Sequence, residues 1–279
     1  MKLVLFTTKI DKGGQAIGEE AKRIFLPCQT YFCEELVYKN GEVFNSSLDP
    51  LSINRDDKII LRDPYNTKSD YSFFTKKILK KYYKNISLDR ECYSKFPFYK
   101  DKLFQTDLFI KLGITAPETF LGRNIKRLLK FPVIVKPRIG SRGRGIRIFN
   151  ESKEMESFFA EKDLLDYIVQ KYHKAKKEHR ILILKHKILG VVDKHIHLKN
   201  EGKVGVRINK GVNDLPVKIK QDAIRITEEL KADFVGVDVI HVENGEYYFL
   251  EANLSPQFHA FAKATGINVA RKVISSALS

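Results

Sequence analysis

The segment from Phe234 to Ser255, FVGVDVIHVENGEYYFLEANLS, places two carboxylates where they can act together. Its two runs rich in Val, Ile, Tyr and Phe flank Asn244-Gly245, a dipeptide that suits a two-residue type I′ turn, and they predict a β-hairpin. If the turn has two residues and the strands have no bulge, Asp238 lies directly opposite Glu251, with Cβ atoms roughly 5 Å apart.

A facing Asp and Glu in apolar strands predict a positive partner, because like charges directly opposite each other destabilise a sheet. Asn253 follows Glu251 by two residues and therefore points to the same face. Two carboxylates and an amide oxygen are hard ligands that suit Mg²⁺, which usually also keeps waters and phosphate oxygens. The predicted metal ligands are Asp238, Glu251 and Asn253, and the alternative is a solvated sheet face.

A second candidate site is the glycine-rich segment Pro137 to Gly145, PRIGSRGRG, between two predicted strands. Glycines allow backbone N–H groups to approach an anion closely, and the Ser and Arg side chains add donors. The segment connects strand to strand, so neither a P-loop nor a Rossmann turn fits. The alternative is a flexible hairpin tip. The predicted phosphate contacts are Lys136, Gly140, Ser141, Arg142, Gly143, Arg144 and Gly145.

The composition is that of an ordinary globular protein with a strong positive charge. The 279 residues are 43% hydrophobic, and 50 Lys and Arg face 34 acidic residues, which leaves a net charge of +16. Such a field favours anionic partners, for example ATP or an acidic substrate. We interpret the densest basic segment, Tyr71 to Lys84, as a solvated amphipathic helix and do not expect nucleic acid as the partner, although non-specific contact stays open.

Cysteine usage and hydropathy narrow the protein class further. The three cysteines, Cys28, Cys33 and Cys92, are odd in number and lack CxxC spacing, which argues against a disulfide framework and a zinc site. No segment reaches the roughly 18 apolar residues of a membrane span, and the first residues are too short an apolar run for a signal peptide. We therefore expect a cytoplasmic protein that does not bind membranes.

The predicted elements form a small α/β unit over residues 1–95, followed by a larger unit over residues 96–279. In the first unit MKLVLF is a strand, Gly13 and Gly14 form a turn, GEEAKRIF is helical, and KIILRDPY is a strand ending at Pro64. In the second unit the predicted helices are 101–112, 152–161, 217–230 and about 268–276, and the predicted strands are 131–136, 146–149, 167–172, 180–184, 188–193 and the hairpin. Most connections between these strands are too short for parallel crossovers, which predicts antiparallel pairing.

The order of these residues resembles the ATP-grasp superfamily and, within it, the RimK-type amino-acid ligases. The resemblance covers roughly residues 100–275, and its most specific parts are the DxExN pattern of the hairpin and the closing text EANLSPQFHAFAKATGINVA. It implies an α+β fold in which two subdomains, about 115–172 and about 173–279, bind ATP between them. A small α/β N-terminal domain precedes them in the chain. The resemblance also implies a ligase that joins a carboxylate to an amine through an acyl phosphate and releases ADP and phosphate.

The resemblance also implies roles for single residues. Lys102 and Lys136 would contact the phosphates of ATP, and Arg207 would stabilise charge on the transferring phosphoryl group. Mg²⁺ or Mn²⁺ would bind the hairpin ligands. The remaining implied ATP contacts are the adenine segment Gln170, Lys171 and Tyr172, the ribose ligand Glu178, and Asn209 beside the γ-phosphate.

The substrate side is less defined. Candidates for substrate contacts are Lys194, Lys210, Ser255 and Gln257, and an exposed lysine is the alternative for Lys194 and Lys210. His195 and His197 share one face of a strand, but no third ligand is evident nearby, so we interpret them as non-metal residues.

The function expected from this resemblance is ligation of an amino acid, with glutamate as one candidate, to a carboxylate of a small metabolite, a peptide or a protein. The positive charge weakly favours an acidic acceptor. Alternatives are a ligase for a peptide natural product or a glutathione-like dipeptide, and a catalytically silent ATP-binding regulator. The oligomeric state, including a homo-oligomer, stays open.

Overall fold

A computed structural model describes residues 1–62, 72–96, 98–140, 143–198, 204–211 and 215–279. The first unit is built on a three-stranded parallel sheet in the order β2-β1-β5. Strand β1 (Leu3–Thr7) is the central strand and is buried at every residue, which explains its run of apolar residues. Strands β2 (Cys28–Phe32) and β5 (Lys58–Leu61) flank it, and helix α1 (Lys12–Arg23) connects β1 to β2.

The prediction of a turn at Gly13 and Gly14 is wrong, because both glycines lie in the first turn of α1. Asp11 caps this helix by accepting a hydrogen bond from the Gly13 amide. A Cβ atom on Gly14 would lie 2.2 Å from Thr7 Oγ1, and one on Gly13 would lie 2.5 Å from Arg62 Nη2. The glycines therefore allow α1 to pack closely against the sheet.

The rest of the first unit comprises a small hairpin, β3 (Val37–Lys39) and β4 (Glu42–Phe44), and helices α2 (Ser72–Tyr82) and α3 (Arg90–Lys95). Helix α2 confirms the amphipathic prediction, since Ile78 and Leu79 are buried while Lys76 and Lys80 are exposed. Strand β5 ends before the predicted Pro64, which lies outside the described residues. Cys28, Cys33 and Cys92 form no disulfide.

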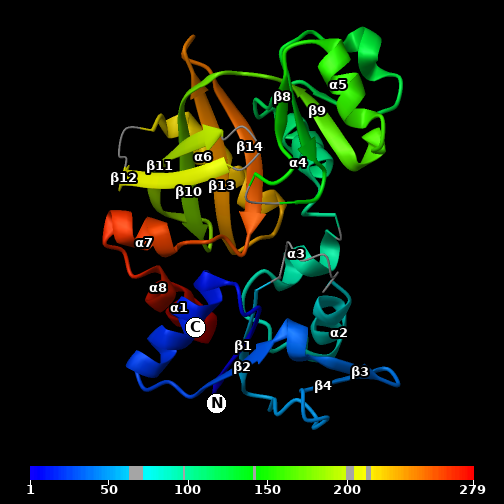
Figure 1. The fold of residues 1–279 in the computed structure, drawn as a ribbon. Helices are drawn as coiled ribbons and strands as arrows, with labels where there is room; N and C mark the ends of the chain where they lie inside the picture. Colours follow the sequence, from blue (N-terminus) through cyan, green and yellow to red (C-terminus); the bar gives the residue numbers. More distant parts are fainter. Residues whose placement is uncertain (63–71, 97, 141–142, 199–203, 212–214) are drawn as a thin grey trace.

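The lid is a four-stranded antiparallel sheet in the order β6-β9-β7-β8, drawn in green in Figure 1. Its strands are β6 (Thr119–Phe120), β7 (Val133–Pro137), β8 (Arg147–Phe149) and β9 (Tyr167–Lys171), and helix α5 (Ser152–Phe159) covers one face. Helix α4 (Lys102–Lys111) precedes the lid, begins at the cap Asp101 and ends before Gly113, whose φ is +67°.

The largest sheet, which we call the catalytic sheet after the role that the resemblance implies, has five antiparallel strands in the order β12-β11-β10-β13-β14. Its strands are β10 (Ala175–Leu184), β11 (Lys187–Leu198), β12 (Val204–Gly211), β13 (Phe234–Val242) and β14 (Tyr247–Leu254). Helix α6 (Val217–Glu229) packs on the face formed by residues such as Ile181 and Val237. Strand β12 was not among the predicted strands.

The opposite face of the catalytic sheet changes character along the strands. At one end Leu182, Leu184 and Phe234 pack against helices α7 (His259–Thr265) and α8 (Val269–Leu278). At the other end the same face carries Arg180 and Asp238. Helices α7 and α8 therefore cover the apolar end of this face, and the charged end faces the lid.

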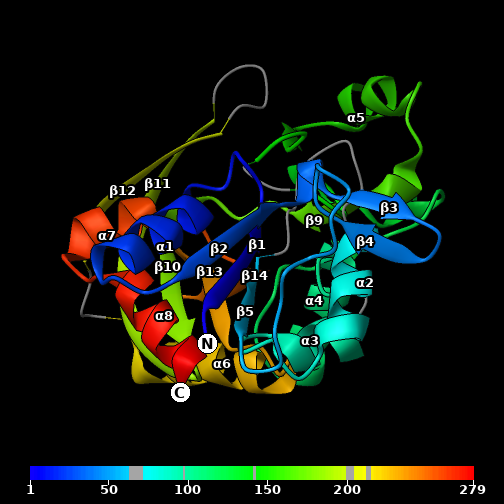
Figure 2. The same cartoon turned by 90° about the horizontal axis from the view of Figure 1, so that it is seen from below.

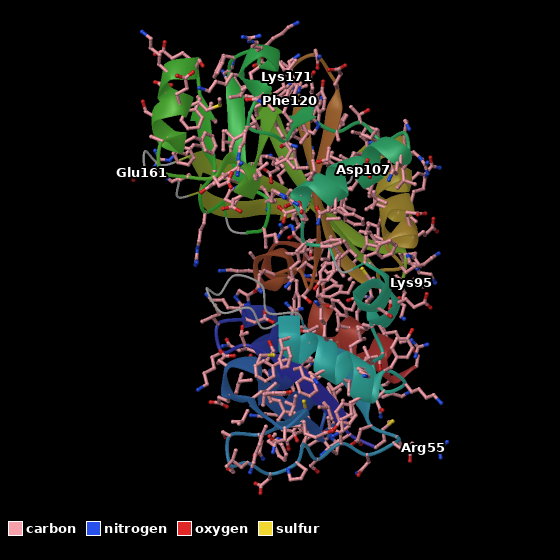
Figure 3. The ribbon with its side chains drawn as sticks, turned by 90° about the vertical axis from the view of Figure 1, so that its right-hand side faces the viewer. Arg55, Lys95, Asp107, Phe120, Glu161 and Lys171 are labelled. Atoms are coloured by element: carbon pink, nitrogen blue, oxygen red, sulfur yellow. The ribbon has the colours of Figure 1, made fainter. Side chains whose placement is uncertain are left out.

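The N-terminal sheet does not have a core of its own. Leu3, Leu5 and Ile17 share a buried cluster with Val269 and Val273 of α8. Figure 2 shows α1 and α8 side by side next to this sheet, and Figure 3 shows the lid, with Phe120 and Lys171, at the opposite end of the molecule from Arg55. The closing helix, predicted as part of the larger unit, thus completes the core of the first unit. No helix among the described residues is long and apolar enough to cross a membrane.

Candidate active site

The hairpin of β13 and β14 places Asp238 directly opposite Glu251, as predicted. The predicted two-residue type I′ turn is wrong, however. The Val242 amide donates to the Glu246 carbonyl, and only Gly245 of the turn has a positive φ, +89°. The loop therefore has three residues and ends in a left-handed glycine. A bulge next to Asp238 shifts the register back by one residue, so the two departures cancel.

The positive partner predicted for the facing carboxylates is supplied by the protein itself. Arg180 forks onto Asp238, with Nε 2.8 Å from Oδ1 and Nη2 2.7 Å from Oδ2. Lys194 Nζ lies 2.8 Å from Asp238 Oδ2 and also forms an ion pair with Glu178. Burial raises the pKa of Asp238, but attraction to Arg180 and Lys194 outweighs it and lowers this pKa to about 2.

Strand register explains this cluster of charges. Arg180 on β10 is the cross-strand partner of Asp238 on β13, and Glu178, two residues before it, is the partner of Lys194 on β11. Residues two apart point to the same face, so the four side chains meet there. Burial raises the pKa of Glu178 in spite of the nearby Lys194 ammonium. Its Oε2 atom is buried and has no hydrogen-bond partner among the described residues, so it can accept a bond from a ligand hydroxyl.

Lys136 on β7 faces this cluster from the lid. Its side chain is buried, and burial together with the charge of Lys102 lowers its pKa to about 8, while Glu251 and Glu178 act in the opposite direction. Lys136 makes no hydrogen bond or ion pair in the part of the chain that the structure describes. A buried ammonium without a partner fits an anionic ligand such as a phosphate group.

The glycine-rich segment forms a hairpin loop between β7 and β8, as predicted. Gly143 and Gly145 have φ values of +67° and +74°, and a Cβ atom on Gly145 would lie 2.8 Å from Pro137 Cγ. Lys102 Nζ donates to the Gly140 carbonyl at 2.9 Å, which ties the loop to the start of α4. Arg144 is exposed, and the predicted contacts Ser141 and Arg142 lie outside the described residues.

The predicted adenine segment lies at the end of β9. Two of its backbone donors are already used, since the Lys171 amide bonds the Glu118 carbonyl and the Tyr172 amide bonds the Pro132 carbonyl. The Gln170 side chain is buried, and its Nε2 donates to Thr119 Oγ1. These contacts fix the segment rigidly at the edge of the lid, and a base held here would have to use other backbone groups of the segment.

Some predicted residues lie where only the backbone is described. Arg207, Asn209 and Lys210 belong to β12, and Arg207 pairs with His195 on β11, while His197 pairs with Gly205. Nothing is described of these side chains, so the roles predicted for them stay predictions.

Three of the predicted substrate contacts, Lys194, Ser255 and Gln257, bond to other protein groups. Lys194 is buried among carboxylates, which excludes the exposed-lysine alternative for this residue. Ser255 is also buried, and its Oγ lies 3.3 Å from Tyr93 Oη. Gln257 Nε2 donates to Asp11 Oδ1 at 2.6 Å, and its Oε1 accepts from the Gly13 amide at 3.2 Å. Ser255 and Gln257 therefore attach the end of β14 to the N-terminal unit.

Sequence reasoning missed two arginines of this region. Arg180 completes the charge cluster, and Arg62 binds Asp11 and donates to the Ser255 and Pro256 carbonyls. Arg180 follows the predicted ribose ligand Glu178 by two residues in a strand. This spacing, which puts both side chains on the same face, was the one feature of the sequence that could have identified Arg180. Arg62 had none, because its partners are distant in the chain.

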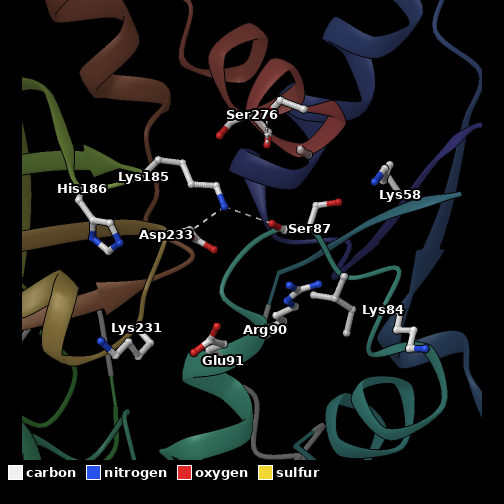
Figure 4. Close-up of a pocket in the computed structure, with 13 residues that line it drawn as sticks. Lys58, Lys84, Ser87, Arg90, Glu91, Lys185, His186, Lys231, Asp233 and Ser276 are labelled. Carbon is white, nitrogen blue, oxygen red and sulfur yellow. Dashed lines mark hydrogen bonds and ion pairs between the residues drawn. The ribbon is translucent and has the colours of Figure 1, made fainter. Parts of the chain in front are cut away.

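A pocket of about 310 Å³ at the other end of β10 is also rich in basic side chains, as Figure 4 shows. Lys185 lies there, 3.0 Å from Asp233 Oδ1 and 3.5 Å from the Ser87 carbonyl. Asp89 and Asp233 each accept a hydrogen bond from the other's amide, at 2.6 and 2.8 Å. These contacts join the end of the first unit to the catalytic sheet, and we call them the Asp89 joint.

The hairpin residues fit a hard divalent cation. Asp238 and Glu251 are cross-strand partners, Asn253 lies on the same face, and Glu251 makes no hydrogen bond or ion pair within the described residues. No group of three or more His, Cys, Asp and Glu side chains suited to a metal occurs among the described residues.

Comparisons with known proteins agree with this geometry. A model of the RimK-like ATP-grasp domain matches residues 100–277. The glutamate–LysW ligase ArgX of Sulfurisphaera tokodaii is 27% identical over 189 residues, which are 62% of this chain and 67% of that protein. The ribosomal protein bS6–L-glutamate ligase of Escherichia coli is 26% identical over 190 residues, 63% of this chain and 62% of that protein.

Solved structures extend the likeness over the whole chain. The ATP-grasp ligase PsnB, complexed with a minimal precursor, has a TM-score of 0.73 at 14% identity and covers 99% of this chain and 98% of its own. A RimK domain ATP-grasp protein from Sphaerobacter thermophilus has a TM-score of 0.71 at 14% identity and covers 100% of both chains. The fold is therefore the ATP-grasp fold, and the chain belongs to the RimK-like ATP-grasp family.

Proposed function

We propose that this protein activates a substrate carboxylate with ATP and Mg²⁺ and joins it to the amino group of glutamate. The chain is an ATP-grasp ligase by family, and the finer statement concerns its metal and substrates. The observation that supports it most is the buried Lys136 of the lid, which faces Asp238 and Glu251 of the catalytic sheet. Cations on one side and metal-type oxygens on the other form a site for a metal-bound polyphosphate.

In this proposal each described residue has a limited task. Lys136 neutralises phosphate oxygens, and Lys102 holds the glycine-rich loop in place through Gly140. Glu178 accepts a hydrogen bond from a ribose hydroxyl with its Oε2 atom, which has no partner within the described part of the chain. Asp238, Glu251 and Asn253 would hold Mg²⁺, which shields the phosphate charge when bound. Arg180 keeps Asp238 ionised and correctly oriented.

The chemical steps need alignment and charge stabilisation more than a protein nucleophile. A carboxylate oxygen of the acceptor attacks the γ-phosphorus of ATP, and ADP leaves with the electron pair of the broken bond. The glutamate amine then attacks the carbonyl carbon of the acyl phosphate, loses a proton and expels phosphate. Negative charge develops on oxygen in both steps, and Lys136 and Arg207 are the cations proposed to stabilise it.

Glutamate and a polypeptide acceptor are proposed from the relatives. One is named a glutamate–LysW ligase and another a ribosomal protein bS6–L-glutamate ligase. The net charge of +16 supports an acidic acceptor, because its field attracts anionic chains.

The test is mass spectrometry of the purified protein with Mg-ATP, the amino acids and a cell extract that contains proteins, peptides and metabolites. We expect ADP together with an acceptor heavier by one or more glutamate residues, and neither product with Glu251→Gln. Incorporation of a different amino acid would overturn the glutamate proposal, and formation of AMP would overturn the acyl phosphate. Modification of a small metabolite alone would overturn the polypeptide acceptor.

A further inference from the structure

We propose that Lys194 competes with the divalent cation for Asp238, so that this ligase binds its metal ion together with the nucleotide and only weakly before it. Once phosphates are present they attract the Lys194 ammonium, which then leaves Asp238 to the metal. This inference rests on the proposed metal role of Asp238 and adds a binding order to it.

Lys194 takes the place that a cation takes between two carboxylates. Its Nζ lies 2.8 Å from Asp238 Oδ2 and forms an ion pair with Glu178, and its side chain is only 7% exposed. The β10–β11 and β10–β13 registers bring these three residues together. The ammonium is therefore built into the metal face and is not a surface lysine that happens to touch it.

Asp238 has little capacity left for a metal ion. A carboxylate offers about four acceptor positions. Arg180 uses two of them through Nε and Nη2, and Lys194 uses a third. Glu251 makes no hydrogen bond or ion pair within the described residues, so the competition concerns Asp238 alone.

Of the two cations on Asp238, Lys194 is the one able to leave. Arg180 is the direct cross-strand partner of Asp238 and holds it with a planar, two-pronged contact. Lys194 is a point charge on a flexible four-carbon stem that can turn without breaking the strand register.

Charge balance gives the direction of the exchange. Lys194 and Arg180 balance Glu178 and Asp238, and Glu251 offsets one of the two positive charges that Lys136 of the lid and Lys102 of α4 add nearby. A divalent cation alone would therefore enter a site already rich in positive charge. A polyphosphate reverses this balance, because it attracts both the metal ion and the ammonium. Metal and nucleotide should then each strengthen the binding of the other, as linkage requires.

The experiment measures Mn²⁺ binding by the electron paramagnetic resonance signal of free Mn²⁺, with and without a non-hydrolysable ATP analogue, and subtracts the Mn²⁺ that the analogue binds in a sample without protein. We expect wild type to bind Mn²⁺ weakly alone and at least tenfold more tightly with the analogue. Lys194→Met should bind Mn²⁺ alone at least fivefold more tightly than wild type and show a smaller gain with the analogue. Lys177→Met is the matched control, because it removes the same charge from an exposed position of β10 and should behave as wild type.

Lys194→Gln is a second variant that keeps a hydrogen-bond donor without the charge, in case the methionine variant is unstable. Equal Mn²⁺ affinity of wild type and both Lys194 variants without nucleotide would overturn the inference. Asp238→Asn separates this outcome from failure of the proposed function. If it leaves Mn²⁺ binding with the analogue unchanged, Asp238 is not a metal ligand. If it abolishes that binding while the Lys194 variants match wild type, only the role of Lys194 is wrong.

Discussion

Two buried aspartates at opposite ends of the catalytic sheet have opposite pKa shifts. Asp238 faces Arg180 and Lys194, and its pKa is lowered to about 2. Asp89 has no cation in direct contact within the described residues. Burial, together with the neighbouring charge of Asp233, raises its pKa to about 7, although it accepts bonds from the Asp233 and Phe234 amides. The same residue type thus acquires two behaviours from its partners alone.

The difference lies in the kind of partner that each aspartate has. Asp238 is held by the charged side chains of Arg180 and Lys194, so a ligand can replace one of these partners. Around Asp89, the partners are backbone amides of the segment that leads into β13, so the contact fastens two parts of the chain. Four non-glycine residues with positive φ, Asp89, Lys185, His186 and Lys231, lie in or beside this joint. Their backbone strain is offset by the contacts they make there.

The largest difference between the two regions should appear in turnover. We expect Glu251→Gln to lower kcat by about 1,000-fold or more, roughly 4 kcal/mol of transition-state stabilisation, with an unchanged melting temperature. Asp238→Asn should lower kcat as strongly and also lower the melting temperature, because it leaves Arg180 and Lys194 buried without an anion. Coupled ADP release and thermal unfolding measure both effects. Wild-type turnover in both variants would contradict the metal assignment.

Removal of Arg180 should have the next largest effect. Arg180→Met leaves Asp238 with Lys194 as its one cation, and we expect the free energy of unfolding to fall by about 3–5 kcal/mol. Arg180→Lys keeps the charge and loses the fork, so it should recover part of this loss. Urea unfolding at neutral pH provides the measurement. A methionine variant as stable as wild type would show that the pair does not stabilise the fold.

The Asp89 joint should reveal itself in the dependence of stability on pH. Because folding raises the pKa of Asp89 from 3.8 to about 7, the folded state holds its proton more tightly, and stability falls as pH rises from about 4 to about 7. Asp89→Asn keeps the acceptor oxygen and removes the charge. We expect it to be more stable than wild type at pH 8 by about 2–4 kcal/mol and nearly equal at pH 4.

Urea unfolding at several pH values tests this expectation, and Asp238→Asn is the informative control. The pKa of Asp238 is lowered on folding, so its contribution is present above about pH 4 and is lost as pH falls toward 2. The two variants should therefore flatten different parts of the profile. An unchanged slope between pH 4 and 7 in Asp89→Asn would refute the raised pKa.

The smallest effect is expected at the β10–β11 turn. Lys185 and His186 both have positive φ in this two-residue turn, where Asn-Gly is the relaxed sequence. The double change Lys185→Asn with His186→Gly relieves that strain but removes the Lys185–Asp233 ion pair and the 2.9 Å contact of His186 with Thr227. These terms oppose each other, so we expect stability within about 1 kcal/mol of wild type and normal turnover. A large loss of turnover in this variant would show that the Asp89 joint affects catalysis.

Local patterns in the chain were sufficient for much of the site. Alternation along 234–255 placed Asp238 opposite Glu251, although the turn type and the bulge behind that pairing were both missed. The glycines of 140–145 predicted a loop between two strands, and Gly143 and Gly145 in it have positive φ values. Sequence patterns predicted α4, α6 and the lid strands β7, β8 and β9, but not β6, because burial of one face imposes its period on the longer elements.

What the sequence by itself determined is therefore the family, and with it a set of candidate site residues, since these depend on residue type and local spacing. Tertiary structure alone decided that Arg180 and Lys194 occupy most acceptor positions of Asp238, that Gln257 and Ser255 attach to the first unit, and that α8 completes its core. These contacts join segments that are far apart in the chain. Which residues meet in these contacts depends on which faces the whole fold buries. The local periodicity of the sequence therefore does not predict them.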